Sequence, residues 1–162
     1  MSKRKVNWKS IVIENPWMLK VIREPGVFLQ LAAVKKNGNA IQFVKDPIER
    51  VQLAAIKKNS KSIQHIKNPT ERVKFKAVSN DGEAIQYIEN PSEELQAEAI
   101  KNDSDCIRFI KNPSEEIQLL SVCLCGESIR HIDNPSEAVK LRAVSNDGKS
   151  IKWIENPSEE IQ

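Results

Sequence analysis

Three kinds of side chain recur at positions where they could bind a ligand: aromatic rings, lysines and cysteines. One slot, which returns every 22 residues, holds a ring in each copy: Phe43, His65, Tyr87, Phe109, His131 and Trp153. The residue before each ring is an amide or a cation: Gln42, Gln64, Gln86, Arg108, Arg130 and Lys152. A row of rings beside polar side chains suits a groove for a peptide or for single-stranded nucleic acid. The alternative is that the rings only pack between repeats.

The second candidate site is a row of lysines in the first half of the chain: Lys35, Lys36, Lys45, Lys57, Lys58 and Lys67. The basic start of the chain adds Lys3, Arg4 and Lys5. Cations at repeating positions could follow phosphates or an acidic protein surface. Lysine also complements the dipole at the C-terminus of a helix without binding anything, so both interpretations stand.

Charge is distributed very unevenly along the chain. Residues 1–80 contain 17 Lys and Arg against 5 Asp and Glu, a net charge of +12. Residues 81–162 contain 8 against 17, a net charge of −9. Such an asymmetry is a physical argument about partners and association rather than about fold.

The cysteines do not indicate chemistry. Cys106, Cys123 and Cys125 are three in number, which does not suit a disulfide framework, and Cys123 and Cys125 form a C-x-C pair without a second pair. We expect all three to be small, ordinary residues, with no metal site and no cofactor. The sequence also lacks a phosphate-binding glycine loop and a nucleophile–base pair, so we predict that the protein is not an enzyme.

These residues recur because the whole chain is a repeat. Seven of the eight prolines, from Pro25 to Pro157, lie 22 residues apart. A fixed period of this length is the signature of a solenoid, in which each unit is buried by its neighbours. We predict an all-α solenoid of about seven two-helix repeats, wound as a right-handed superhelix. The predicted single repeat domain, 1–162, consists of an N-terminal cap unit at 2–23, six full repeats at 24–155 and a partial repeat at 156–162.

Each repeat is predicted to begin with a helix of about ten residues. The Asn or Asp before proline, as at Asn90-Pro91, should cap this helix, with Glu93 completing a capping box three residues later. Apolar residues five, nine and ten places after the cap form its buried stripe. Asn37-Gly38 and its counterparts should end the helix, because these residues tolerate a left-handed backbone.

A second apolar segment follows in each repeat, for example Ala40 to Val44. Its apolar residues lie three apart, and an Asn or Asp that can cap stands in front of it, which favours a short helix over a strand. The two ends of the chain should differ from the inner repeats. Trp8 and Trp17 can cover the first repeat. The partial repeat 156–162, which includes Ile161, is either a short cap or leaves the apolar face of the last full repeat open for a partner or another copy.

The stretch Ala32-Ala33-Val34-Lys35-Lys36-Asn37-Gly38-Asn39-Ala40-Ile41-Gln42-Phe43 and its copies resemble helical repeats scattered through bacterial, phage and large-virus proteins, a family of unknown function. The alternation of a longer and a shorter helix is similar to leucine-rich variant repeats and, more distantly, to HEAT repeats. The resemblance covers almost the whole chain and carries no catalytic residues.

The sequence therefore predicts a cytoplasmic, non-enzymatic scaffold that binds another protein along a surface built from repeats. The family's distribution implies a phage or mobile-element protein that inhibits a host factor. One alternative is binding of a nucleic-acid backbone through the basic half, and another is head-to-tail association of basic and acidic ends. The first basic residues are followed by only three apolar ones, Ile11 to Ile13, so no membrane partner is expected.

Overall fold

The computed structural model describes residues 6–161, and the chain divides into two compact units that span 1–80 and 81–162. Among the described residues seven α-helices alternate with seven 3-10 helices (η), and no strand is present. This confirms the predicted all-α repeat fold of helix pairs and makes the short segments helical. The handedness of the superhelix stays a prediction.

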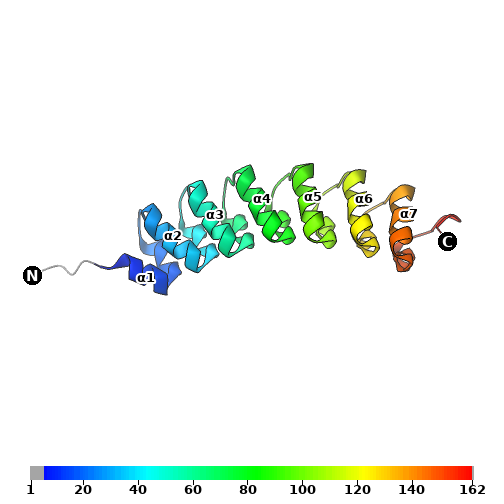
Figure 1. Ribbon diagram of the computed structural model, residues 1–162. Helices are drawn as coiled ribbons and strands as arrows, with labels where there is room; N and C mark the ends of the chain where they lie inside the picture. The colour runs from blue at the N-terminus through cyan, green and yellow to red at the C-terminus, as the bar shows by residue number, and fades with distance from the viewer. Residues whose placement is uncertain (1–5, 162) are drawn as a thin grey trace, which may run out of the picture. The chain divides into compact units, whose positions relative to one another are not determined.

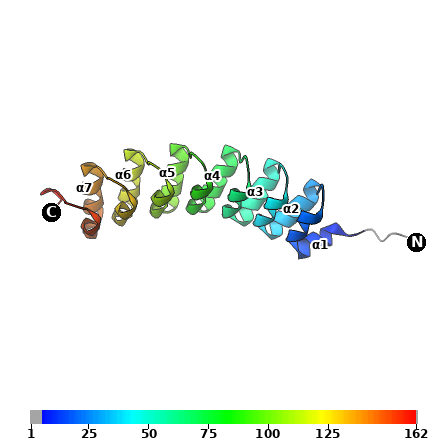
Figure 2. The same cartoon turned by 180° about the vertical axis from the view of Figure 1, so that it is seen from behind.

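In the first unit the α-helices follow one another side by side (Figure 1, and from behind in Figure 2). Its elements are α1 (Trp8–Glu14), η1 (Pro16–Val21), α2 (Val27–Lys36), η2 (Gly38–Phe43), α3 (Glu49–Lys58), η3 (Ser60–His65) and α4 (Glu71–Asn80). Each α-helix packs on the next, and consecutive 3-10 helices pack on each other. The predicted helix length of about ten residues is confirmed in α2, α3 and α4.

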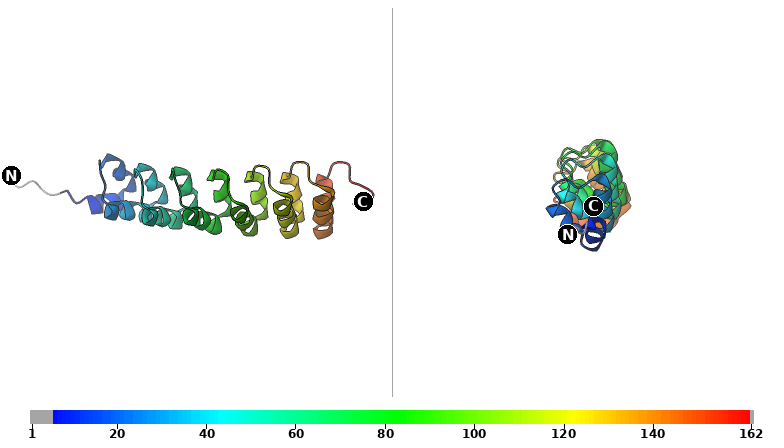
Figure 3. Two further views of the ribbon diagram at one scale, coloured as in Figure 1. Left: turned by 90° about the horizontal axis from the view of Figure 1, so that it is seen from above. Right: turned by 90° about the vertical axis from the view of Figure 1, so that its left-hand side faces the viewer.

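The second unit repeats the same arrangement, as the view from above in Figure 3 shows. Its elements are η4 (Gly82–Tyr87), α5 (Glu93–Asn102), η5 (Ser104–Phe109), α6 (Glu115–Leu124), η6 (Gly126–His131), α7 (Glu137–Asn146) and η7 (Gly148–Trp153). Here too each α-helix packs on the next, and the 3-10 helices pack in sequence.

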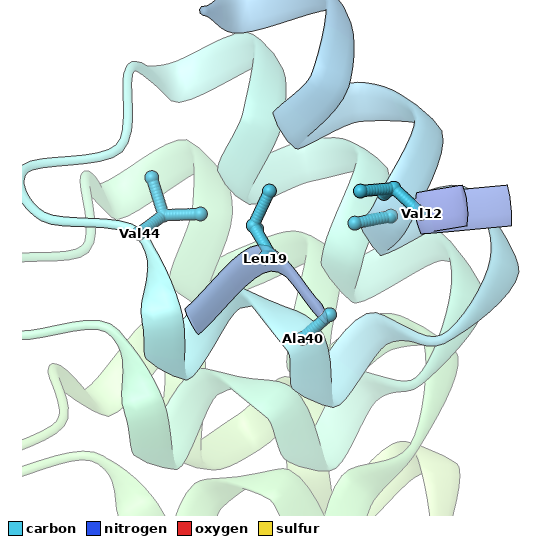
Figure 4. Packing of buried hydrophobic residues seen from close by; sticks show 5 residues of the cluster. Val12, Leu19, Ala40 and Val44 are labelled. Atoms are coloured by element: carbon cyan, nitrogen blue, oxygen red, sulfur yellow. The ribbon is translucent and has the colours of Figure 1, made fainter. Parts of the chain in front are cut away.

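The buried stripe lies where the spacing of apolar residues predicts it. In α3 the side chains of Val51, Ala55 and Ile56 are completely buried, and the equivalent residues of α4 and α5 are 0–2% exposed. The atypical first repeat uses the same frame. Figure 4 shows Leu19 of η1 with Val12 of α1 and with Ala40 and Val44 of the next repeat around it.

Small residues allow the backbones of consecutive repeats to approach closely. A Cβ atom at Gly38, the first residue of η2, would lie 2.6 Å from the carbonyl oxygen of Ala55 in α3. At Gly126 it would lie 2.5 Å from the carbonyl oxygen of Ala143 and 2.7 Å from Ser150 Oγ. Real Cβ atoms do not come so near to backbone oxygen, so these positions require glycine for space. The alanines that recur at one position of the α-helices are fully buried: Ala33, Ala55, Ala77, Ala99 and Ala143.

The predicted cap at the start of the α-helices is wrong. Asp46, Asn90, Asn112, Asn134 and Asn156 have positive φ angles between 48° and 51° and lie in the turn before the helix. The proline that follows disfavours helical backbone at these residues, and Asn and Asp are among the few residues that tolerate the left-handed region.

The side chain that caps these helices comes two residues after the Asn or Asp. The hydroxyl of Ser92 accepts a hydrogen bond from the backbone N–H of Leu95, and Ser136 and Thr70 act in the same way. The glutamate of the predicted capping box therefore begins the helix, as Glu93 begins α5. A glutamine in the first turn then ties the helix to the turn, as Gln96 Nε2 does by donating to the carbonyl oxygen of Pro91 at 2.9 Å.

The prediction that Asn37 and its counterparts end the α-helices with a left-handed backbone is also wrong. The second role predicted for these residues, capping of the short helix that follows, is confirmed. Asn37 has an extended backbone, with φ −143°, and no glycine in the described part of the chain has positive φ. The side chain of Asn37 accepts from the backbone N–H of Asn39 and so caps η2. Asn59, Asp81, Asp103 and Asp147 cap the following 3-10 helices in the same way.

Gly126→Ala should destabilise the protein by about 1–3 kcal/mol, because the added methyl group must displace backbone of the next repeat. Gly148→Ala is the matched control, since Gly148 begins η7 in the same way but has open space around it. The control should be neutral or stabilising by up to about 1 kcal/mol. Urea unfolding followed by circular dichroism measures both, and equal effects of the two substitutions would contradict the packing argument.

Candidate functional site

The six predicted ring positions are here called the ladder: Phe43, His65, Tyr87, Phe109, His131 and Trp153. Each of them ends a 3-10 helix. Trp153 is 47% exposed, and the other five are half-buried. The rings are therefore neither fully packed nor free. Among the described residues one pair of rings is in contact: Trp17 of η1 and Phe43 of η2 lie 5.5 Å apart, nearly perpendicular to each other. Trp17, which the sequence suggested as a cap, thus packs on the first ring of the ladder.

The polar residues beside the rings of the second unit form ion pairs with the preceding repeat. Arg108 Nη2 lies 2.8 Å from Glu83 Oε1, and Lys152 Nζ lies 2.7 Å from Glu127 Oε1. Arg130 pairs with Asp105 in the same way. Each pair joins the second residue of one 3-10 helix to the fifth residue of the next, 25 positions further on. These cations, which the sequence placed along a groove, already have anionic partners within the protein.

The same cations also cover the rings. The guanidinium of Arg108 lies 4.6 Å from the centre of the Phe109 ring, and Lys152 Nζ lies 5.2 Å from that of Trp153. Such contacts favour cations over aromatic faces. In the middle repeat Arg130 Nε donates to His131 Nε2 at 2.9 Å. Burial, as the main cause, lowers the pKa of His131 below its usual value, against the opposing effect of Asp105, which agrees with a neutral imidazole that accepts this bond.

The amides in the same slot bond back to their own helices. Gln42 Nε2 donates to the carbonyl oxygen of Asn39, Gln64 to that of Lys61, and Gln86 to that of Glu83. All three side chains are nevertheless exposed at the surface. A ligand could therefore reach them only by competing with one weak intrahelical bond.

Two open hollows adjoin the ladder in the second unit. One, of about 550 Å³, is lined by Phe109, His131 and the turn at Asn112-Pro113. The other, of about 660 Å³, is lined by Trp153 and the turn at Asn134-Pro135. Both lie between consecutive repeats and combine ring edges with polar turn atoms.

The predicted lysine row consists of two positions in the repeat. Lys35 and Lys36 end α2, and Lys57 and Lys58 end α3, whereas Lys45 and Lys67 lie in the turns after η2 and η3. All six are exposed, and within the part of the chain that the structure describes none of them belongs to an ion pair. Lys3, Arg4 and Lys5 lie outside the described residues.

A hollow of about 580 Å³ marks the strongest concentration of lysine. Lys57, Lys58 and Lys76 line it together with Asn59 and Asn80. Lys76 comes from α4, which packs against α3 in the first unit. The sequence analysis did not single out Lys76, because no lysine occupies its position in the neighbouring repeats.

The remaining predicted positions are structural. Trp8 is half-buried. Ile161, in the C-terminal partial repeat, is 4% exposed, so its side chain is covered. All three cysteines are free thiols. Cys106 is completely buried, and Cys123 Sγ accepts from Arg142 Nε at 2.9 Å.

Sequence reasoning missed two features that the repeat pattern could have revealed. The anions Glu83, Asp105 and Glu127 recur at one slot of the second unit, 25 residues before the three cations. The exposed apolar residues Val27, Phe28 and Ile48 stand where the later repeats carry Glu, then Arg, Glu or Ala, and then Ser or Thr. A comparison of the repeats slot by slot would find both.

Comparison of the chain with protein-family models, with curated proteins and with solved structures finds no match in any of the three. The family resemblance of the repeats therefore stays a prediction. Residues 6–161 include no helix with the length and hydropathy of a membrane span. The same residues contain no group of three or more His, Cys, Asp and Glu side chains placed to hold a metal ion.

Cys106 should resist a thiol reagent in the folded protein, whereas Cys123 and Cys125 react. Burial, followed by the charge of Asp103, raises the pKa of Cys106 to about 12, so at pH 8 only about one ten-thousandth of it is thiolate. Ellman's reagent should show two fast thiols in the native state and the third after unfolding. Cys106→Ala, which installs the residue found at Ala40 and Ala84, should leave the fast phase unchanged. Three equally fast thiols would contradict the assignment.

Proposed function

We propose that this protein is a non-enzymatic scaffold that binds an acidic surface of a partner protein through its first unit. The observation that carries the proposal is the contrast between the lysines at the helix ends of the first unit and the cations beside the rings of the second unit. The lysines at the ends of α2 and α3 are exposed and belong to no ion pair within residues 6–161, whereas Arg108, Arg130 and Lys152 are paired internally. Only the first set is available to an external anion without breaking an existing contact.

Charge supports the same surface. Residues 1–80 carry 17 basic against 5 acidic side chains, a net charge of +12. A field of one sign attracts and orients an oppositely charged partner before contact. The lysine pairs of α2 and α3 occupy equivalent positions in repeats whose helices pack about 8–10 Å apart. An acidic surface with carboxylates at a similar spacing would meet several of them at once.

Inhibition of a host factor by a phage or mobile element, in the cytoplasm, belongs to this proposal and rests on the resemblance of the repeats. The absence of catalysis is also part of it. The buried thiol of Cys106, with its raised pKa, is a poor nucleophile. His131 Nε2 accepts from Arg130 Nε rather than from a side chain that the imidazole could activate.

A nucleic-acid backbone is the second candidate ligand, because the lysine pairs of α2 and α3 lie one repeat apart and Lys57 and Lys58 line the hollow of about 580 Å³. Contacts to phosphates would make affinity fall steeply with salt and leave it independent of sequence. Association of the basic unit of one copy with the acidic unit of another is the third candidate, since the net charges are +12 and −9.

A variant that combines Lys35→Gln, Lys57→Gln and Lys58→Gln should bind the partner at least about tenfold more weakly, because it removes unpaired cations from the surface. The matched control combines Lys101→Gln, Lys111→Gln and Lys149→Gln in the second unit, since it removes the same charge from exposed residues. The partner is captured from an extract of the host cells, identified, purified and titrated by calorimetry against wild type and both variants in 0.15 M salt.

Equal affinities of the two variants would refute the proposal. Duplex and single-stranded oligonucleotides of mixed sequence are titrated in parallel over a salt series. Tight binding of these, without a captured protein, would replace the proposal with the nucleic-acid function. A mass that doubles at low salt in light scattering, in the purified protein alone, would favour self-association instead.

A further inference from the structure

We propose that Val27, Phe28 and Ile48 form an apolar patch that anchors a partner segment in which acidic residues alternate with large apolar side chains. The inference rests on the proposed function, because it identifies the anchor of that basic surface. Val27 and Phe28 are the first two residues of α2, and Ile48 is the residue that precedes α3. Their exposed fractions are 40%, 61% and 51%. Large apolar side chains exposed together, unlike isolated ones, mark interaction sites.

The register of the repeat places Val27 and Ile48 together, and Phe28 follows Val27 in α2. The hydroxyl of Thr70, before α4, donates to Glu49 Oε1, at the start of α3, at 3.5 Å. Ser136, before α7, donates to Glu115 Oε1, at the start of α6. The residue before one helix therefore lies beside the first residue of the preceding helix. Ile48 and Val27 hold these two positions in α3 and α2, so they are neighbours.

The patch breaks the rule that the other repeats obey. The later α-helices all begin with glutamate, namely Glu49, Glu71, Glu93, Glu115 and Glu137. Ser92 and Ser136 cap their helices through a side-chain oxygen, whereas Gly26 and Ile48 have no oxygen in the side chain and Ser114 makes no such bond. An apolar first turn forgoes both the cap and the favourable interaction of an acid with the helix dipole. Local rules are broken in this way where a site serves function at the expense of stability.

The charge around the patch indicates the occupant. Lys9 Nζ lies 4.9 Å from the centre of the Phe28 ring. Arg72 lies 3.8 Å from Glu49 across consecutive repeats, and Arg50 holds the equivalent position beside Val27. The first turns of α1 and α2 contain no acidic residue. A ligand here would meet apolar surface with Lys9 and Arg50 beside it, which fits a segment that presents Asp or Glu next to an aromatic or aliphatic side chain.

The distance to the lysine row favours an extended protein segment. Val27 begins α2 and Lys36 ends it, so the patch and the lysines are separated by about 14 Å along the helix axis. About four residues of extended chain cover that distance. A segment of this length could place its apolar anchor on the patch and its carboxylates at Lys35 and Lys36.

The test restores the repeat's own residues with Val27→Glu and Ile48→Ser in one variant. This reversion should raise the thermal midpoint by about 2–4 °C, because it supplies a cap and a favourable dipole interaction. The same variant should bind at least about tenfold more weakly, because it removes the anchor. Phe75→Glu with Leu124→Ser is the matched control, since it makes the same types of change at residues that are 46% and 52% exposed.

The probe is a library of random 16-residue peptides displayed on phage and selected on the wild-type protein. The strongest binders are synthesised and titrated by fluorescence anisotropy against wild type, the reversion, the control and the Lys35/Lys57/Lys58→Gln variant. We expect acidic peptides with at least one large apolar residue, tighter for wild type and control than for the reversion. No enrichment, peptides without acidic residues, or equal binding to the reversion would overturn the proposal.

The lysine variant separates the two hypotheses. If it weakens binding and the reversion does not, the patch is wrong and the basic scaffold stands. If neither variant weakens binding, both are wrong. Sedimentation with vesicles of phosphatidylserine and phosphatidylcholine tests the other chemistry that a basic apolar patch could meet, and binding lost in the reversion would assign the patch to a lipid surface instead.

Discussion

The close approach of the backbone between consecutive repeats determines the rest of this structure. Gly38 and Gly126 lie so near to the carbonyl oxygens of Ala55 and Ala143 that a single methyl group would collide with them. Because backbone meets backbone here, neither partner can shift without loss of packing. The contact therefore fixes the register of these helix pairs against the next, whereas η3 and η5 begin with Ser60 and Ser104 at the same position. That register decides which side chains meet at the other positions.

The same register serves different interactions in the two units. At the second position of the 3-10 helix, the first unit has Trp17, whose ring meets Phe43, and Asn39, whose Oδ1 accepts from Asn59 Nδ2 and Ser62 Oγ. In η4, η5 and η6 of the second unit this position is acidic and pairs with a cation of the next 3-10 helix. Partly exposed pairs of this kind contribute little to stability singly. Their larger consequence is that they occupy cations which would otherwise face a ligand.

Much of the fold could be predicted because it follows from local rules applied every 22 residues. The stripe at Val51, Ala55 and Ile56 follows from helical spacing and is buried as expected. The role of Asn90 could not be read in this way, since asparagine favours both a helix cap and a left-handed turn. The proline after it decides between them through backbone geometry.

The candidate site was harder to predict because it depends on contacts between repeats. The sequence around Arg108 does not reveal its ionic partner, because Glu83 lies 25 residues away and is brought beside it only by the register of the repeats. Lys57 also lacks an evident partner in the sequence, and it remains unpaired among the described residues. In a repeat protein the shared residues specify the fold, so binding specificity must come from residues that differ between copies. Phe28 is such a residue, because it is an exposed aromatic side chain where the equivalent residues Arg50 and Arg72 are charged. The departures from the repeat, rather than its most regular features, therefore define where a partner would bind.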